Sequence, residues 1–132
     1  MKIEYLHSGS IDCPLIRIYG NEPALIKRLI DICDRLYKGE TKTYAIHKIE
    51  GFEPIHDIEL FFALGNKDIG IRRRKKDKNL FECILASETW AQIADLARPL
   101  IEHGPSDETY FQWLDETSNI SLLLTTSKLG EW

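Results

Sequence analysis

Residues 58–101 read IELFFALGNKDIGIRRRKKDKNLFECILASETWAQIADLARPLI, and this stretch decides the predicted fold. Apolar side chains alternate with their neighbours from Ile58 to Leu64, which is the two-residue period of a strand with one buried face. The next residues, 65–68, read GNKD, and Gly and Asn tolerate the positive φ of a tight turn. We therefore predict a hairpin between this strand and a second strand that begins at Ile69.

A second hairpin is predicted farther along the same stretch, with its turn at Asp77-Lys78. A two-residue turn there gives a register in which β-branched side chains and opposite charges face one another across the strands. The third strand, 81–86, then leads into an amphipathic helix, because apolar residues recur at helical spacing from Trp90 to Ile101. The predicted cross-strand pairs are Ile71 with Ile84, Arg73 with Glu82 and Arg74 with Phe81.

Strand-like and helical patterns flank this stretch on both sides. An apolar stripe from Leu25 to Tyr37, with Pro23 in the first turn, predicts another helix. Further strands are predicted at 2–7, 15–19, 43–49, 110–114 and 120–125. The order β-β-α-β-β-β-β-α-β-β predicts an α+β domain, a two-layer sandwich in which both helices cover one face of a largely antiparallel sheet of about six to eight strands.

The sheet face opposite the helices is predicted to be apolar. In the predicted register it carries Phe61, Phe81, Cys83 and Leu85. Monomers seldom leave so much apolar surface bare. We therefore expect the sheet to curl around these residues, or the C-terminal hairpin or a second subunit to cover them, and a homodimer is one predicted arrangement.

The composition is ordinary for a globular protein. At 132 residues, of which 43% are hydrophobic and 29% charged, the chain suits a single domain spanning 1–132. No run of about 18 apolar residues is present and the first residues lack the pattern of a secretory signal. We therefore predict no membrane association and a cytoplasmic location. The net charge of −4 gives no overall attraction to nucleic acid.

The residues that could support catalysis do not form a known pattern. Cys13 follows an acidic residue, which disfavours a thiolate, and no Arg stands at the spacing of a phosphatase loop. The histidines lack metal-binding spacing, and no serine lies in a nucleophile elbow. We predict no catalytic residue, no metal site and no cofactor, and we favour a protein that is not an enzyme. A small enzyme using Cys13 or a histidine is an alternative.

The basic run at 72–78 is the one feature that directly suggests a partner. Cations at the end of a projecting hairpin could contact phosphates, so nucleic-acid binding is an alternative function. Cations on an exposed strand also keep a sheet edge soluble and block pairing with another chain. We favour this second interpretation because the chain as a whole is acidic. The six cations are Arg72, Arg73, Arg74, Lys75, Lys76 and Lys78.

Aromatic residues of the second helix and the C-terminal hairpin mark the first place to look for a ligand cleft. They are Trp90, Tyr110, Phe111 and Trp113, and packing in the core is their alternative role. The sequence identifies no molecular activity. Its leading prediction is a small protein-binding or regulatory module without catalytic activity, whose partner is another protein or a second copy of the chain. A small acidic domain also suits an immunity or antitoxin role.

Overall fold

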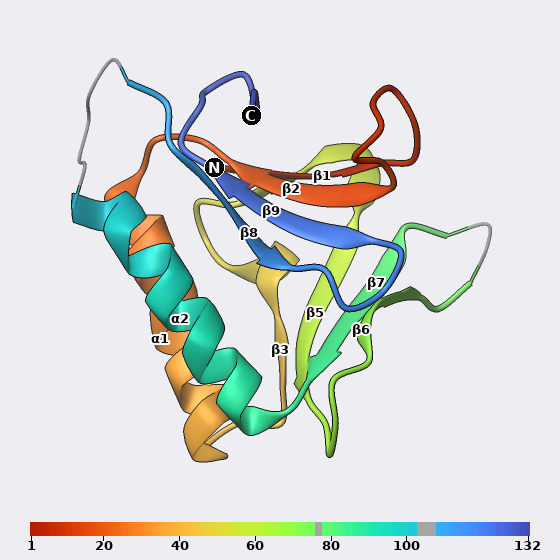
Figure 1. The fold of residues 1–132 in the computed structure, drawn as a ribbon, viewed down its shortest axis with the longest axis vertical. Coiled ribbons are helices and arrows are strands. Elements are labelled where there is room, and N and C mark those ends of the chain that lie inside the picture. Colours follow the sequence, from red (N-terminus) through yellow and green to blue (C-terminus); the bar gives the residue numbers. More distant parts are fainter. Residues whose placement is uncertain (76–77, 103–107) are drawn as a thin grey trace.

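A computed structural model describes residues 1–75, 78–102 and 108–132. Strands, two α-helices and two short 3-10 helices alternate along these residues (Figure 1). Their bounds are β1 Lys2–Leu6, β2 Leu15–Tyr19, α1 Pro23–Lys38, β3 Thr43–Ala45, η1 Ile46–Lys48, β4 Glu53–Pro54, η2 Ile55–Asp57, β5 Glu59–Leu64, β6 Gly70–Arg73, β7 Leu80–Leu85, α2 Ser87–Glu102, β8 Phe111–Asp115 and β9 Ser121–Thr125.

The strands form two mixed sheets. A five-stranded sheet has the order β4-β1-β2-β9-β8, and a four-stranded sheet has the order β3-β5-β7-β6. Three of the strand pairs, β1 with β4, β2 with β9 and β5 with β7, are parallel. The predicted α+β class and its two helices are confirmed. The predicted single, largely antiparallel sheet is corrected to two mixed sheets.

The predicted hairpin between β5 and β6 does not form. β5 pairs with β7 in parallel, and β6 lies on the far side of β7. The reason lies in the loop after β5, because Asp68 is held at the start of α2. Its carboxylate accepts hydrogen bonds from the Ala86 amide at 2.9 Å and the Thr89 hydroxyl at 2.8 Å. The loop therefore crosses the end of β7 instead of folding back along β5.

The second predicted hairpin, β6 with β7, is confirmed as an antiparallel pair, but its register was wrong by one residue. Ile71 faces Cys83 and Arg73 faces Phe81. The Arg74 amide donates to the Leu80 carbonyl at 2.9 Å, and beyond it the Lys78 amide donates to the Lys75 carbonyl at 3.2 Å. Of the two predicted turn residues, position 77 lies outside the described residues.

The parallel pairing of β5 and β7 also corrects the predicted apolar outer face. Phe62 faces Cys83 across this pair, so both side chains point to the same side, where both are fully buried. Phe81 and Leu85 are likewise fully buried on that side. Only Phe61 of the four residues lies on the outer face, and it is half-buried. The large bare apolar surface that suggested a homodimer is therefore absent from the described part of this sheet.

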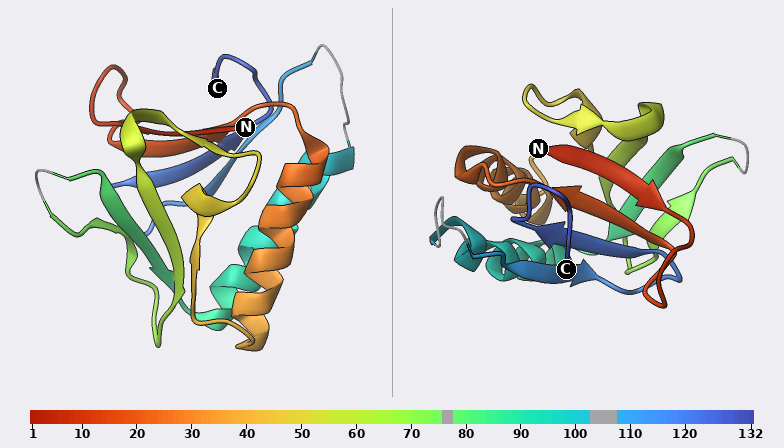
Figure 2. Two further views of the ribbon diagram at one scale, coloured as in Figure 1. Left: turned by 180° about the vertical axis from the view of Figure 1, so that it is seen from behind. Right: turned by 90° about the horizontal axis from the view of Figure 1, so that it is seen from above.

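The core fills the space between the helices and the two sheets. The helices lie side by side along one flank of the molecule, and the two sheets close the other sides (Figures 1 and 2). Helix α1 forms where predicted and ends at Gly39, whose left-handed backbone lets its amide bond the Leu36 carbonyl. Trp90 of α2 anchors the core, since its ring lies 4.8 Å from that of Phe62 and its indole N–H donates to the Ala63 carbonyl at 3.1 Å.

The outer face of the five-stranded sheet is covered by the C-terminal segment, residues 126–132. The Arg17 guanidinium donates to the Gly130 carbonyl at 2.8 Å, and the Thr125 hydroxyl donates to the Glu131 carbonyl at 2.7 Å. The Trp132 ring contacts that of Trp113 edge-on at 6.5 Å. This sheet is therefore packed on both faces, in agreement with the C-terminal segment that crosses it in Figure 2.

Candidate functional site

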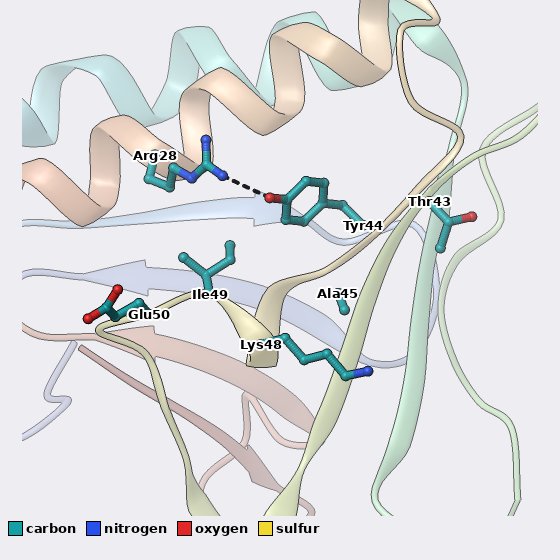
Figure 3. Close-up of a pocket in the computed structure, with 7 residues that line it drawn as sticks. All are labelled: Arg28, Thr43, Tyr44, Ala45, Lys48, Ile49 and Glu50. Carbon is teal, nitrogen blue, oxygen red and sulfur yellow. Dashed lines mark hydrogen bonds between the residues drawn. The ribbon is translucent and has the colours of Figure 1, made fainter.

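A groove of about 620 Å³ runs beside strand β3, one of the two edge strands of the four-stranded sheet (Figure 3). Its wall includes three consecutive residues of the strand, Thr43, Tyr44 and Ala45. Consecutive strand residues point to opposite faces of a sheet. A groove that touches all three must therefore follow the backbone edge of the strand rather than either face. The remaining lining residues are Arg28 of α1 and Lys48, Ile49 and Glu50 after the strand.

Only some of the backbone groups of β3 form hydrogen bonds with β5. The Leu64 amide donates to the Lys42 carbonyl at 2.8 Å, which makes this a hydrogen-bonded pair of the antiparallel β3–β5 ladder. Such pairs alternate with pairs whose amides point outward. The next hydrogen-bonded pair is therefore Tyr44 with Phe62, and the amides of Thr43 and Ala45 point into the groove.

His47 ends this strand. The chain turns into η1 after Ala45, so the strand no longer supplies a partner for the backbone of Leu60. The His47 Nδ1 takes that place, 3.1 Å from the Leu60 amide and 3.3 Å from its carbonyl. The ring also contacts Phe61 edge-on at 5.1 Å. Its Nε2 is buried without a hydrogen bond and lies 4.0 Å from a carboxylate oxygen of Glu59.

Arg28 is the charged residue best placed to contact a ligand in the groove. Its guanidinium is half-buried and donates to the Tyr44 hydroxyl at 2.8 Å, with its centre 5.8 Å from the middle of the Tyr44 ring. Figure 3 shows Arg28 and Tyr44 on the helix side of the groove, Lys48 on the other side and Ile49 between them. An anion or a polar backbone entering the groove would therefore meet an oriented cation above an apolar floor.

The structure separates the cations of the predicted binding run. Arg72 and Arg74 contact the same carboxylate, that of Glu82, at 3.9 and 2.8 Å. Arg73 turns to the opposite side, where it lies over the rings of Tyr5 and Phe81 at 5.3 and 5.4 Å. Lys75 and Lys78 are exposed, and Lys76 lies outside the described residues.

The aromatic residues of the predicted cleft are not brought together. Trp90 is fully buried between α2 and the four-stranded sheet. Trp113 lies on the outer face of the other sheet, against Trp132. Tyr110 bonds the Glu108 carboxylate, and this hydrogen bond raises the pKa of its hydroxyl. Phe111 is the first residue of β8 and is 48% exposed.

The cysteines divide into two kinds. Burial raises the pKa of the Cys33 thiol to about 12 and that of Cys83 well above its usual range, so both are protonated at neutral pH. Cys13 is half-buried, 3.7 Å from the Ser10 hydroxyl. Among the described residues, no three His, Cys, Asp or Glu side chains gather closely enough to hold a metal ion. No helix within the described ranges has the length and apolar character needed to cross a bilayer.

Comparison with known protein families, with curated proteins and with solved structures finds no match for this chain. The groove beside β3 was not predicted from the sequence. It depends on the position of α1 beside β3. The two elements meet at the hydrogen bond between Arg28 and Tyr44, which lie 16 positions apart in the sequence. The available signal was the mixed pattern of residues 43–49, in which the strand alternation stops before His47.

Proposed function

We propose that this chain is a protein-binding module that takes up an extended segment of its partner as an additional strand beside β3. The observation that carries the proposal is the groove along β3, into which the amides of Thr43 and Ala45 point. Strand addition uses such backbone donors for affinity and the neighbouring side-chain pockets for selectivity. Tyr44 and Ile49 supply the pocket walls on one side of the strand.

The experiment is selection from a displayed library of random ten-residue peptides, followed by measurement of the affinity of the enriched peptides by isothermal titration calorimetry. The key variant is Ala45→Pro, which removes the amide that the added strand would use. Proline suits this position because Ala45 has a φ of −85° and lies on an edge strand. Ala45→Ser is the matched control, since it changes the side chain and keeps the amide.

The proposal predicts that Ala45→Pro lowers the affinity at least tenfold while Ala45→Ser leaves it within about twofold, because one lost backbone bond of about 1.4 kcal/mol corresponds to a factor of ten. Equal affinities of the two variants would contradict strand addition. The same groove could also receive β3 of a second copy. Light scattering distinguishes this outcome, because a self-paired module has twice the monomer mass and loses it in Ala45→Pro.

Nucleic-acid binding through the basic hairpin is the weaker proposal. Three of its cations already contact protein groups, namely Arg72 and Arg74 with Glu82 and Arg73 with two aromatic rings. Lys75 and Lys78 are exposed, and neither forms an ion pair with another described residue. Fluorescence anisotropy with single- and double-stranded oligonucleotides at low salt tests this function. Binding that the double variant Lys75→Glu/Lys78→Glu abolishes would support it, and no binding at low salt would remove it.

A further inference from the structure

We infer that the segment bound beside β3 carries a carboxylate side chain, from Asp or Glu, that pairs with Arg28. This inference rests on the proposed function and adds the chemical class of the partner. It follows from the state of the guanidinium in the groove. Arg28 is half-buried and held by one hydrogen bond to Tyr44, while a guanidinium carries five N–H donors. Most of its donors therefore stay available to a ligand.

The charges around the groove favour an acidic ligand. Neither Arg28 nor Lys48 takes part in any ion pair among the residues that the structure describes. Glu50 also lines the groove but forms no ion pair with either cation, and with two cations and one acid the lining has a net positive charge. Arg17, which is also half-buried, differs from Arg28 because it is paired with Glu4. The groove thus presents a cation that the described chain leaves without a counter-ion.

The Tyr44 hydroxyl fixes the direction of the guanidinium. A hydrogen bond of 2.8 Å holds one amino group, and the guanidinium lies over the Tyr44 ring. A planar fork that is held in place matches the two oxygens of a carboxylate better than a mobile ammonium group does. Arg28 is therefore oriented before a ligand arrives, and less side-chain entropy is lost when the ion pair forms.

The strand geometry places this carboxylate on one side of the added segment. Tyr44 points to the helix side, because its cross-strand neighbour Phe62 is buried there against Trp90. A residue of the added strand that points the same way meets Arg28, and the residues before and after it point toward the Lys48 side. The inference therefore predicts one acidic residue in the bound segment, at the position whose side chain points toward Arg28, and not a uniformly acidic peptide.

The test uses peptides enriched from the random library described above. The inference predicts that Asp or Glu recurs at one position, and that changing this residue to Asn or Gln lowers the affinity at least tenfold. In the variant Arg28→Gln, which keeps a donor for the Tyr44 hydroxyl, the acidic and neutral peptides should bind equally. Thermal unfolding of Arg28→Gln, measured by circular dichroism, shows whether the variant is folded. Arg35→Gln, on the same helix but outside the groove, is the matched control and should preserve the preference for the acidic peptide.

The outcomes separate this inference from the function on which it rests. Enriched peptides that depend on the Ala45 amide but show no acidic position would overturn the inference and leave the strand-binding function intact. A tenfold preference that persists in folded Arg28→Gln would assign the carboxylate to another cation and overturn the role of Arg28. If Arg28→Gln does not fold, Tyr44→Phe removes only the hydroxyl and should reduce the acidic preference, whereas an unchanged preference contradicts the inference. No enriched peptide at all would overturn both proposals.

Discussion

The two edges of the four-stranded sheet differ in how they are protected from a further strand. Edge strand β6 carries Arg72 and Arg73, and the Ser118 hydroxyl donates to its Ile71 carbonyl at 2.7 Å. Edge strand β3 reads TYA, has no charged residue and borders a groove. Proteins commonly blunt free edges with charges, bulges, prolines or covering loops. The comparison indicates that β6 is protected and that β3 is left open.

The five-stranded sheet supports this comparison. Its edge strand β4 is two residues long and ends in Pro54, which lacks a backbone donor. Its other edge strand, β8, contains an irregularity between Trp113 and Asp115. Both are recognised devices against edge-to-edge pairing. Among the described edges, β3 thus differs from the other three, which is why the proposed binding of a partner strand concerns this edge.

The largest expected effect tests the protected edge. Gly70 in β6 has a φ of +85°, and a Cβ added there would lie 2.7 Å from the Ser118 backbone nitrogen. Gly70→Ala should lower the free energy of unfolding in urea by about 2–4 kcal/mol, because strain and a backbone clash add. Gly39→Ala is the control, since its φ of +73° is similar but no atom lies within 4 Å, so only about 1 kcal/mol is expected. Equal losses would show that the loop at Ser118 does not press against β6.

The second prediction concerns the residue that ends the open edge. His47→Ala leaves the amide of the fully buried Leu60 without its acceptor. The free energy of unfolding should fall by about 1–3 kcal/mol, the cost of an unsatisfied buried donor. His47→Asn, which retains a side-chain acceptor, should lose less. A measured loss below about 0.5 kcal/mol for His47→Ala would mean that the Leu60 amide finds another partner.

The third prediction concerns the hydrogen bond by which Ser118 protects edge strand β6. Ser118→Ala deletes the hydroxyl that donates to Ile71 and accepts from the Ile120 amide. We expect a loss of about 1 kcal/mol, together with faster hydrogen exchange along β6 and unchanged exchange along β3. Ser8→Ala, in an exposed loop, is the control and should change neither the free energy of unfolding nor the exchange along β6. Exchange that increases equally at both edges would contradict separate protection.

The smallest effect on stability is predicted at the open edge. Ala45→Pro should change the free energy of unfolding by no more than about 0.5 kcal/mol, because its φ of −85° is close to that of proline and its amide points away from β5. A loss above about 2 kcal/mol would show that this amide bonds within the protein. The variant thus combines a near-neutral effect on folding with the large effect on binding proposed above.

The sequence predicts local structure better than it predicts how strands pair. Helix α1, the β6–β7 hairpin and the β8–β9 hairpin follow from apolar spacing and nearby turns, and all three form. The β5–β7 pairing could not be predicted because it depends on Asp68 meeting the start of α2, a contact between residues 18 and 21 positions apart. The same limit hid the groove, since Arg28 and Tyr44 meet only when α1 packs beside β3.

The basic run shows how a charge pattern can be divided by a fold. In sequence it forms one block, but alternation along β6 and the residue after it sends Arg72 and Arg74 to Glu82 on the outer face and Arg73 over Tyr5 on the other. A prediction from charge density alone cannot make that division. The cross-strand partner of each cation depends on the pairing of β6 with β7, and the register predicted for that pair was wrong by one residue. Arg28, which has no carboxylate partner among the described residues, lies in an ordinary helical pattern and gave no signal of its own.

Amide hydrogen exchange of strand β3, measured residue by residue by NMR, tests the open edge most directly. In the free protein the Tyr44 amide should be protected by its ladder bond to Phe62, and the amides of Thr43 and Ala45 should exchange rapidly. Addition of a peptide enriched from the library should then protect Thr43 and Ala45. Protection of all three amides in the free protein, or rapid exchange at Ala45 in the peptide complex, would contradict the account of β3 as an open binding edge.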